Sequence, residues 1–362
     1  MFFSCLTLAD EEQRIQRIIN GNPATVTEFP WMANLFIENA VNSGFGSSCG
    51  GTLISAEWIL TAAHCFLNTE GNAIDVSSGA RVTVLLGSNT IELPESGSTT
   101  VQSSLVIIHP NYNPNFETSP NSNDFDIALL KLSSPVTQTP ITLLSEGDNN
   151  PAVGSPVTVS GWGATRVNVN NQAVSSSNSL LQVNQLVVSN SDCAAIYSNG
   201  ITENMICAGG TTAQDTSDSC QGDSGGPLFL LQNNTFLQVG LSSFGGTNIV
   251  CGDPNVPGVY TRVSRFIDFI QAQVPSVLLS TTDTPTICAG ATLDSNFNIS
   301  IPCVLVNGSA IQTELNIVPE QGFLWSWPGT SSANSCTTSM DTCTTIESDL
   351  SLTVRGVVVD GV

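Results

Sequence analysis

Basic side chains are scarce in this sequence: lysine and arginine together number 8, against 30 aspartates and glutamates, and the net charge is −22. Nucleic acid is therefore not an expected partner, because binding to phosphates needs a basic face. No apolar run approaches the roughly 20 residues that a membrane-spanning helix requires, so no span is expected in this chain. The cysteines form no C-x-x-C pair and no zinc-like cluster with histidine, so a metal is not expected. We expect no cofactor.

Cysteine itself is plentiful, with 11 residues in a chain of 362. Cys5 stands alone, six cysteines lie between Cys49 and Cys251, and four lie in the last quarter, namely Cys288, Cys303, Cys336 and Cys343. Even numbers within two segments favour disulfides and an oxidising compartment. The N-terminal "MFFSCLTLA" resembles the end of a secretory signal, although an ordinary N-terminal tail also fits it. We therefore expect a secreted or extracellular protein, either free or associated with the cell surface.

The pattern of short apolar runs predicts an all-β protein. From Ile18 to about Ala272, β-branched runs such as "RVTVLLG" and "SPVTVSGWG" alternate with turn residues, as is typical of a β-barrel or sandwich. One helix is predicted over 264–273, with Pro275 after its end. A Ser/Thr/Pro-rich stretch follows, and beyond it two alternating runs flank Asn307-Gly308, which predicts a β-hairpin in a small domain closed by two disulfides.

Three residues have the chemistry for nucleophilic catalysis. His64, one of two histidines beside His109, follows an apolar run in "LTAAHC". Asp126 leads into the apolar "DIALLKL", where an unsupported carboxylate is costly. Ser224 lies among glycines in "GDSGGP", a turn whose N–H groups suit an oxyanion hole. A serine hydroxyl becomes a nucleophile when an imidazole removes its proton and a carboxylate orients that imidazole.

Each of these residues also has a plainer interpretation. A lone histidine is usually structural, and a glycine-rich string is often only a turn. Asp126 could simply mark the start of a strand, and Asp124 competes with it for the role of orienting carboxylate. The three residues together favour a catalytic role more strongly than each does alone, because each stands in a specific sequence context and their chain order is His, Asp, Ser.

Their contexts resemble the trypsin-like, chymotrypsin-fold serine proteases. The motifs are "IINGNPATVTEFPWMANL", "CGGTLISAEWILTAAHC", "DIALLKL", "SGWG", "MICAGG", "DSCQGDSGGPL" and "PGVYTRVSRFIDFI". The resemblance covers residue 18 to about 273 and implies two six-stranded antiparallel β-barrels with a C-terminal helix. The small disulfide-linked β domain that follows resembles the extensions of some bacterial secreted members. We divide the chain into a signal remnant and propeptide (1–17), a protease domain (18–275), a linker (276–286) and a β-rich domain of unassigned role (287–362).

The resemblance implies a role for each site residue. His64 would act as general base and then general acid, Asp126 would orient it, and Ser224 would attack the scissile carbonyl. The backbone N–H groups of Gly222 and Ser224 would hold the oxyanion. Ser243 matches the residue that hydrogen-bonds the aspartate.

Specificity is implied by the residues around the pocket. Asp218, six residues before Ser224, matches the floor of the primary specificity pocket, and a buried carboxylate there predicts cleavage after Arg or Lys. Gly245 and Gly258 match the pocket walls, and Phe244 stands where the family often has Trp. Residues 243–245 would pair with the substrate backbone as an added strand.

Activation is implied by the segment before the first barrel. Arg17-Ile18 in "QRIQRIINGN" matches an activation bond, and the freed ammonium of Ile18 would pair with Asp223. Taken by itself, Arg17 is also an ordinary basic residue in a tail.

Further features complete the resemblance. Three family disulfides are implied, Cys49–Cys65, Cys193–Cys207 and Cys220–Cys251. Residues 87–97 align with the calcium loop of some relatives but lack their first acidic ligand, so Glu92 and Glu95 are interpreted as a solvated face.

The function predicted from the sequence is a secreted, monomeric serine endopeptidase, made as a zymogen, that acts on proteins or peptides with Arg or Lys at the cleavage site. The alternative is a catalytically inactive relative that serves as a binding or adhesion protein.

Overall fold

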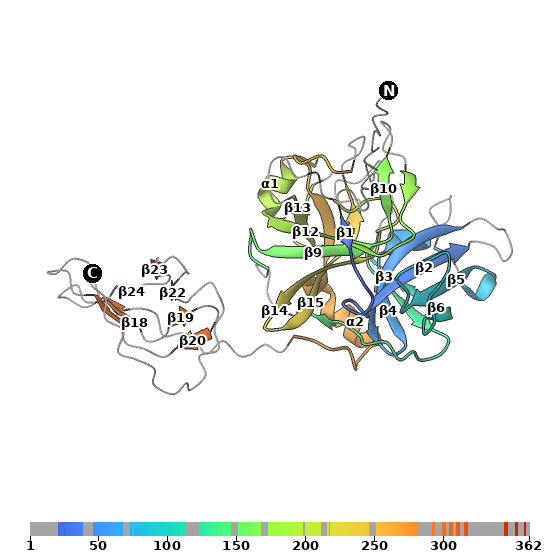
Figure 1. Ribbon diagram of the computed structural model, residues 1–362, viewed down its shortest axis with the longest axis horizontal. Coiled ribbons are helices and arrows are strands. Elements are labelled where there is room, and N and C mark those ends of the chain that lie inside the picture. The colour runs from blue at the N-terminus through green and yellow to red at the C-terminus, as the bar shows by residue number, and fades with distance from the viewer. Residues whose placement is uncertain are drawn as a thin grey trace, which may run out of the picture. The chain divides into compact units, whose positions relative to one another are not determined.

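The computed structural model describes residues 21–38, 46–67, 73–74, 76–112, 123–145, 151–167, 173–197, 200–210, 216, 218–245 and 251–280, and the backbone of the short strands β17–β24. The chain divides into two compact units, Met1–Ser280 and Thr281–Val362. The first unit contains both β-barrels (Figure 1).

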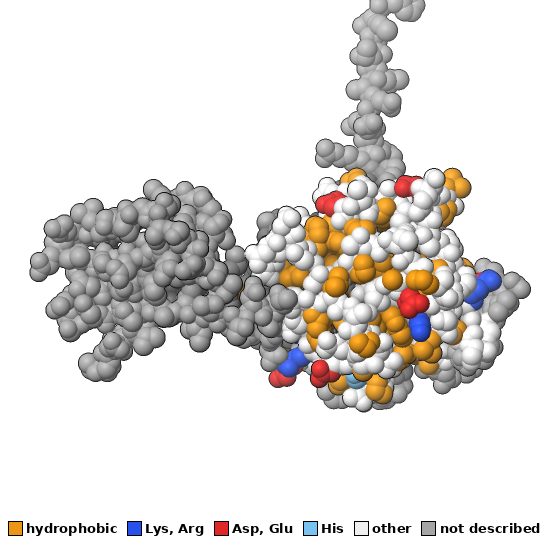
Figure 2. All heavy atoms as spheres, turned by 90° about the horizontal axis from the view of Figure 1, so that it is seen from below, with side chains coloured by type: hydrophobic (Ala, Val, Ile, Leu, Met, Phe, Trp, Pro, Cys, Tyr) orange, Lys and Arg blue, Asp and Glu red, His pale blue; other side chains and the backbone are white. Residues whose placement is uncertain are grey.

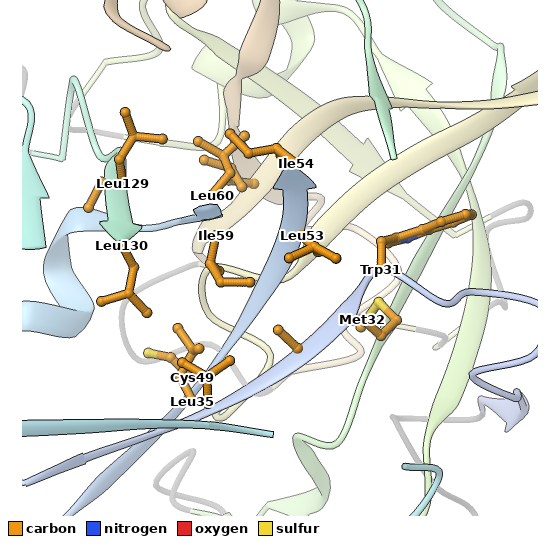
Figure 3. Close-up of a cluster of buried hydrophobic side chains, with 14 of the residues drawn as sticks. Trp31, Met32, Leu35, Cys49, Leu53, Ile54, Ile59, Leu60, Leu129 and Leu130 are labelled. Carbon is orange, nitrogen blue, oxygen red and sulfur yellow. The ribbon is translucent and has the colours of Figure 1, made fainter. Parts of the chain in front are cut away.

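The first barrel is a closed, antiparallel, six-stranded barrel with the spatial order β2-β3-β4-β7-β6-β5. Its strands are β2 (Met32–Glu38), β3 (Ser47–Ser55), β4 (Trp58–Thr61), β5 (Arg81–Leu86), β6 (Thr99–Ile108) and β7 (Ala128–Leu132). Alternation along β2 directs Leu35 and Ile37 into the core, while Phe36 between them is 41% exposed. Figure 3 shows side chains of β2, β3, β4 and β7 meeting in this core, among them Leu35, Leu53, Ile59 and Leu130.

The second barrel is built from the later strands. β12 pairs with both β9 and β13, which closes the path β9-β12-β13-β16-β15-β14-β9 into a ring of six antiparallel strands. These strands are β9 (Pro156–Gly161), β12 (Leu181–Val188), β13 (Met205–Gly209), β14 (Pro227–Gln232), β15 (Thr235–Phe244) and β16 (Gly258–Arg262). Two short strands attach to this sheet, β1 (Asn22–Pro23) and β8 (Thr142–Leu143), and β10 (Ala164–Val167) pairs with β11 (Ala173–Ser176) separately. The predicted pair of six-stranded barrels is therefore confirmed.

Short helical segments connect the strands. They are the 3-10 helices η1 (Ala63–Phe66), η2 (Val76–Ser78) and η3 (Val263–Phe266), and the α-helices α1 (Asn190–Ala194) and α2 (Ile267–Gln273). The helix predicted over 264–273 is thus a 3-10 turn that continues into α2, with Ile270 fully buried against the first barrel. The helix α1 was not predicted.

The residues after α2 remain part of the first unit. The Leu143 N–H donates to the Leu278 carbonyl (2.8 Å), and the Ser280 N–H donates to the Leu143 carbonyl (2.7 Å). The interval predicted as a linker, 276–286, therefore begins with residues that are bonded to the barrel. Its remainder lies outside the described residues.

The second unit contains two four-stranded sheets, in the orders β21-β18-β17-β24 and β20-β19-β22-β23. Their strands are β17 (Thr292–Leu293), β18 (Ile299–Ile301), β19 (Val304–Val306), β20 (Ser309–Ile311), β21 (Leu315–Ile317), β22 (Thr344–Ile346), β23 (Leu352–Thr353) and β24 (Val358–Val359). The antiparallel pairing of β19 with β20 confirms the predicted hairpin around 307–308. The four cysteines of this region lie outside the described residues.

The surface reflects the low content of charged residues, 10% of the chain. Figure 2 shows few charged side chains on the face it presents, scattered among apolar and uncharged polar groups. Within the described residues, no helix has the length and apolar character that crossing a membrane would need.

Candidate active site

His64 lies at the end of the first barrel's strand β4, in the turn η1. Its backbone N–H donates to Asp126 Oδ1 (2.9 Å), and its ring Nδ1 lies 2.7 Å from Asp126 Oδ2. The side chain of His64 is 25% exposed and that of Asp126 is 1% exposed. The Nδ1 edge of the imidazole is therefore held by a buried carboxylate, while the rest of the ring stays partly exposed to solvent.

Asp126 is held from several directions just before β7. Besides the two contacts with His64, its Oδ2 accepts from Ser243 Oγ (2.5 Å), and its backbone carbonyl accepts from Thr261 Oγ1 (2.7 Å). A buried carboxylate is tolerated when its lone pairs are satisfied in this way. Strands of the second barrel thus help to position a carboxylate that belongs to the first.

Ser243 reaches Asp126 because of a bulge in β15. The pairing of β15 with β16 passes from Ser242 opposite Tyr260 to Phe244 opposite Val259, and leaves Ser243 as the extra residue. A bulge bends the strand and redirects the side chain of its extra residue. The residue that the resemblance assigned to this hydrogen bond makes it here.

The pKa values of His64 and Asp126 are shifted in opposite directions, as acid–base catalysis by the histidine needs. Burial lowers the pKa of His64, but the charge of Asp126 and the hydrogen bond to it outweigh burial, so that the pKa lies above 6.5. Burial raises the pKa of Asp126, but the His64 charge and the hydrogen bonds from His64 and Ser243 outweigh it, so that this pKa is lowered. The carboxylate therefore stays ionised and supports the imidazolium.

Ser224 lies in a tight turn that only a glycine can follow. Gly225 has a φ of +75°, and a Cβ there would fall 2.2 Å from Thr61 Oγ1 and 2.7 Å from the Gly50 carbonyl oxygen. The Ser224 carbonyl accepts from the Gly50 N–H (2.7 Å), and the Gly225 N–H donates to the Ser242 carbonyl (2.7 Å). The first of these bonds joins the serine turn to β3 of the first barrel, and the second joins it to β15 of the second barrel.

The serine turn also lies close to His64. Cys65, which follows His64, forms a disulfide with Cys49 of β3, and its Sγ lies 3.8 Å from the Ser224 carbonyl oxygen. In the described part of the chain, the Ser224 hydroxyl and the N–H groups of Gly222 and Ser224 make no hydrogen bond. These three groups remain available to a substrate.

A pocket of about 200 Å³ opens beside Ser224. It is lined by Asp218, Ser219, Cys220, Gln221, Ser224, Ser242, Ser243, Phe244, Gly245, Cys251, Val256, Pro257 and Gly258. The Phe244 ring packs edge-on against Tyr197, with ring centroids 5.7 Å apart. A Cβ at Gly258 would lie 3.1 to 3.4 Å from the Tyr260 hydroxyl and ring, whereas one at Gly245 would meet no atom of the described residues within 4 Å.

Among the described residues that line this pocket, Asp218 is the one with an acidic side chain. Its carboxylate accepts from the Gly252 N–H (3.0 Å) and from Gln185 Nε2 (3.3 Å), and no cation pairs with it in the described residues. Burial raises the pKa of Asp218 to about 7, against the opposing effect of these hydrogen bonds. A cationic ligand would relieve the cost of this charge.

Asp223 is a second carboxylate without a charged partner in the described residues. It is fully buried and accepts from the Gly163 N–H (2.8 Å) and the Cys220 N–H (3.0 Å). Burial raises its pKa to about 6 despite these bonds. A Cβ at Gly163, the second glycine of "SGWG", would lie 2.4 Å from Asp223 Oδ2. Glycine at this position therefore leaves the space that the carboxylate fills. Arg17 and Ile18 lie outside the described residues.

The structure joins the three cysteine pairs that the resemblance implied. Besides Cys49–Cys65, Cys193 of α1 is bonded to Cys207 of β13, and Cys220 is bonded to Cys251. The last pair ties together two segments of the pocket wall.

Two competing residues have other surroundings. Asp124 Oδ1 accepts from Asn204 Nδ2 (2.9 Å) and from the Phe125 N–H (2.9 Å), so it does not orient His64. The His109 ring stacks on Phe125 and lies edge-on to Phe266 and Phe269, with centroids 4.8 to 5.3 Å apart. The plainer interpretation, a structural histidine, therefore fits His109.

Neither the loop of residues 87–97 nor the cysteines near His64 provide a set of metal ligands in the described residues. Asn89 Nδ2 donates to both carboxylate oxygens of Glu95, at 3.2 and 2.9 Å. Among the described residues, one group of three potential ligands lies within 4.8 Å of one another, Cys49, His64 and Cys65, and its two sulfurs are joined as a disulfide.

Comparisons with known proteins agree with this arrangement. The family model described as Trypsin matches residues 18–270. The chain is 35% identical over 260 residues to "Trypsin" of Sus scrofa, covering 71% of this chain and 96% of that protein. It is 36% identical over 261 residues to "Kallikrein-4" of Homo sapiens, covering 71% and 87%. It is 32% identical over 273 residues to "Vitamin K-dependent protein C" of Mus musculus, covering 74% of this chain but only 54% of that protein.

Proposed function

We propose that this chain, which belongs to the trypsin family of serine proteases, is a secreted endopeptidase that cleaves peptide bonds after arginine or lysine. The observation that carries the proposal is the placement of Ser224 and Asp218 on one pocket, beside a histidine fixed by Asp126. A substrate side chain bound in this pocket would contact the Asp218 charge, and its backbone carbonyl would lie near the Ser224 nucleophile and the His64 base.

In the proposed reaction, His64 Nε2 takes the proton of Ser224 Oγ as this oxygen bonds to the scissile carbonyl carbon. The carbonyl oxygen takes up the negative charge and accepts hydrogen bonds from the Gly222 and Ser224 N–H groups. The C–N bond breaks as His64 protonates the leaving amine, and an acyl-enzyme remains. Water, deprotonated by His64, then attacks the ester, and the C–O bond to Ser224 breaks as His64 returns the proton to Ser224 Oγ and the acid is released. Asp126 holds the Nδ1–H tautomer and stabilises the imidazolium throughout.

Selection of basic residues would come from Asp218. Its carboxylate lies in the pocket with neutral donors and no cation in the described residues, so an arginine or lysine side chain would supply the missing charge. The end of β15, residues 243–245, would pair with the substrate backbone as an added strand.

Activation would follow cleavage of the Arg17–Ile18 bond. The new ammonium of Ile18 would pair with the buried Asp223 carboxylate, which has no cation among the described residues, and would thereby settle the adjoining Gly222 turn. Secretion is supported by the three disulfides, which persist in oxidising compartments. The alternative of an inactive binding homologue gains no support, because the triad side chains are present and the pocket is open.

The test uses the full chain, cleaved after Arg17, with matched peptide substrates that differ only in the residue before the scissile bond. We expect cleavage after Arg and Lys, little after Phe or Ala, and complete loss in Ser224→Ala. An organophosphorus reagent should label Ser224 in the wild type and leave Ser224→Ala unlabelled. Processed protein that cleaves neither Arg nor Lys bonds would refute the proposed specificity, and activity that survives Ser224→Ala would refute the mechanism.

A further inference from the structure

A buried glutamine occupies an inward position of the second barrel. Along β12, burial alternates so that Leu181, Val183, Gln185 and Val187 face the interior, where the other three pack with apolar residues. Gln185 has no exposed surface. An amide placed among aliphatic side chains is costly unless its donors and acceptor are satisfied, so this position calls for specific partners.

Its partners lead to the pocket floor. Gln185 Oε1 accepts from the Tyr260 hydroxyl (2.9 Å), and Gln185 Nε2 donates to Asp218 Oδ1 (3.3 Å). The Tyr260 oxygen also lies 3.1 Å from Ser219 Oγ. Tyr260 is fully buried, and neither it nor Gln185 lines the pocket. The glutamine therefore contacts the specificity carboxylate from the protein side.

Each oxygen of the Asp218 carboxylate has a donor from the protein. Gln185 bonds to Oδ1 and the Gly252 N–H bonds to Oδ2 at 3.0 Å. Donors on both oxygens fix the plane of the carboxylate, and a hydrogen bond from the Ser219 backbone also stabilises its charged form. A guanidinium needs this presentation, because it binds a carboxylate with two parallel hydrogen bonds, whereas an ammonium binds as a point charge.

We propose that Gln185 is a specificity-determining positioning residue, whose amide, oriented by Tyr260, holds the Asp218 carboxylate ready for bidentate binding of arginine. This inference rests on the proposed function, because it assigns arginine as the preferred member of the proposed substrate class. The same hydrogen bond stabilises the charged form of Asp218. Among the described residues, the other ionisable groups that interact with this carboxylate are Asp223, Tyr197 and Tyr260.

The test replaces the amide with a side chain of similar length that has no strong hydrogen-bonding group, Gln185→Met. We expect kcat/KM for an arginyl peptide to fall about ten-fold and that for the matched lysyl peptide to fall less, because one hydrogen bond to a charged group is lost. Benzamidine, which stays cationic over the whole pH range of the assay, should bind more weakly to Gln185→Met than to the wild type at pH 7. The pH midpoint of its inhibition constant should move upward, because the lost donor favours the charged form of Asp218.

Tyr260→Phe provides a second variant, which removes the donor to Gln185 Oε1 and should shift the Arg/Lys ratio in the same direction by a smaller factor. Gln182→Met is the matched control on β12, since Gln182 is partly exposed and lies outside the pocket lining. Thermal unfolding establishes that each variant is folded. If Gln185→Met does not fold, the Arg/Lys ratio of Tyr260→Phe alone tests the role of Gln185.

An Arg/Lys ratio and a benzamidine pH midpoint that match the wild type in a folded variant would overturn the inference. An equal loss for arginyl, lysyl and neutral substrates would also overturn it, because that result describes general structural damage. A wild type that cleaves neither Arg nor Lys bonds would refute the proposed function instead, while the benzamidine measurement would still decide the role of Gln185.

Discussion

Replacement of Asp126 by asparagine tests the proposed catalytic arrangement most directly. The substituted amide would retain the shape of the side chain and the backbone bond from Thr261, but it would remove the charge that lies 2.7 Å from His64 Nδ1. At a charge separation of about 4 Å and an effective dielectric constant of about 20, the lost attraction for the imidazolium is about 4 kcal/mol. Since about 1.4 kcal/mol corresponds to a factor of ten, kcat should fall by about 10³-fold.

The wrong tautomer adds to this loss. An amide N–H facing Nδ1 would favour the imidazole that carries its proton on Nε2, where it cannot accept from Ser224. The same change in the family's template triad lowers kcat by about 10⁴-fold, so the combined expectation is about 10³ to 10⁴. In addition, the pKa of His64 should fall below 6.5, because burial lowers it and the opposing carboxylate charge is gone.

The assay is kcat for an arginyl peptide measured from pH 5 to pH 10 on processed protein. The acid limb of the Asp126→Asn profile should lie at lower pH than that of the wild type, at a much reduced plateau. Asp124→Asn is the matched control, because its carboxylate bonds to Asn204 and the Phe125 N–H rather than to His64. A loss of less than about ten-fold in Asp126→Asn, or an equal loss in both variants, would refute the reasoning.

Three further predictions concern Asp218, Asp223 and the disulfide beside the pocket. Asp218→Ser should lower kcat/KM for arginyl peptides by about 10² to 10⁴-fold while sparing substrates with an apolar residue, since one partner of a buried ion pair is removed; equal loss on both substrates would contradict this. In the uncleaved protein, the folded pKa of Asp223, about 6, lies above its ordinary value of 3.8, so its stabilising contribution is complete below about pH 4 and is lost as the pH rises through 6. The Tm of Asp223→Asn should therefore fall less than that of the wild type between pH 4.5 and pH 7.5, and identical slopes would exclude the effect. Loss of the Cys220–Cys251 disulfide, which spans 31 residues, in the double Cys→Ser variant should lower the free energy of unfolding in urea by about 3 to 4 kcal/mol and raise KM, and an unchanged KM would show that this bond does not shape the pocket.

Local sequence patterns failed where an element was too short to show a period. The helix α1 has five residues, fewer than two turns, so no amphipathic stripe could reveal it. A capping signal was nevertheless present, because Ser189 Oγ accepts from the Asp192 N–H (3.0 Å) at its start. The longer segment ending at Gln273 was predicted from its apolar spacing, and only its first turn differs, being 3-10 rather than α.

Residues that support the site were harder to find than the residues that form it. Thr261, which donates to the Asp126 carbonyl, lies 135 residues away in the chain and belongs to no motif that names its role. Gln185 left a weak signal, since it is polar at an inward position of an alternating strand. The signal gives no partner, because the partner depends on which strands are neighbours in the barrel.

The sequence by itself determined the all-β class and the candidate histidine, aspartate and serine, because alternation, turn chemistry and side-chain type are local properties of the chain. The sign of the pocket's charge followed only from the resemblance to the family. Tertiary structure alone decided which groups touch these residues: the bulge that turns Ser243 toward Asp126, the space at Gly163 that Asp223 fills, and the amide of Gln185 behind Asp218. Those contacts join segments 33 to 117 residues apart, and only barrel closure and strand register bring them within hydrogen-bond distance.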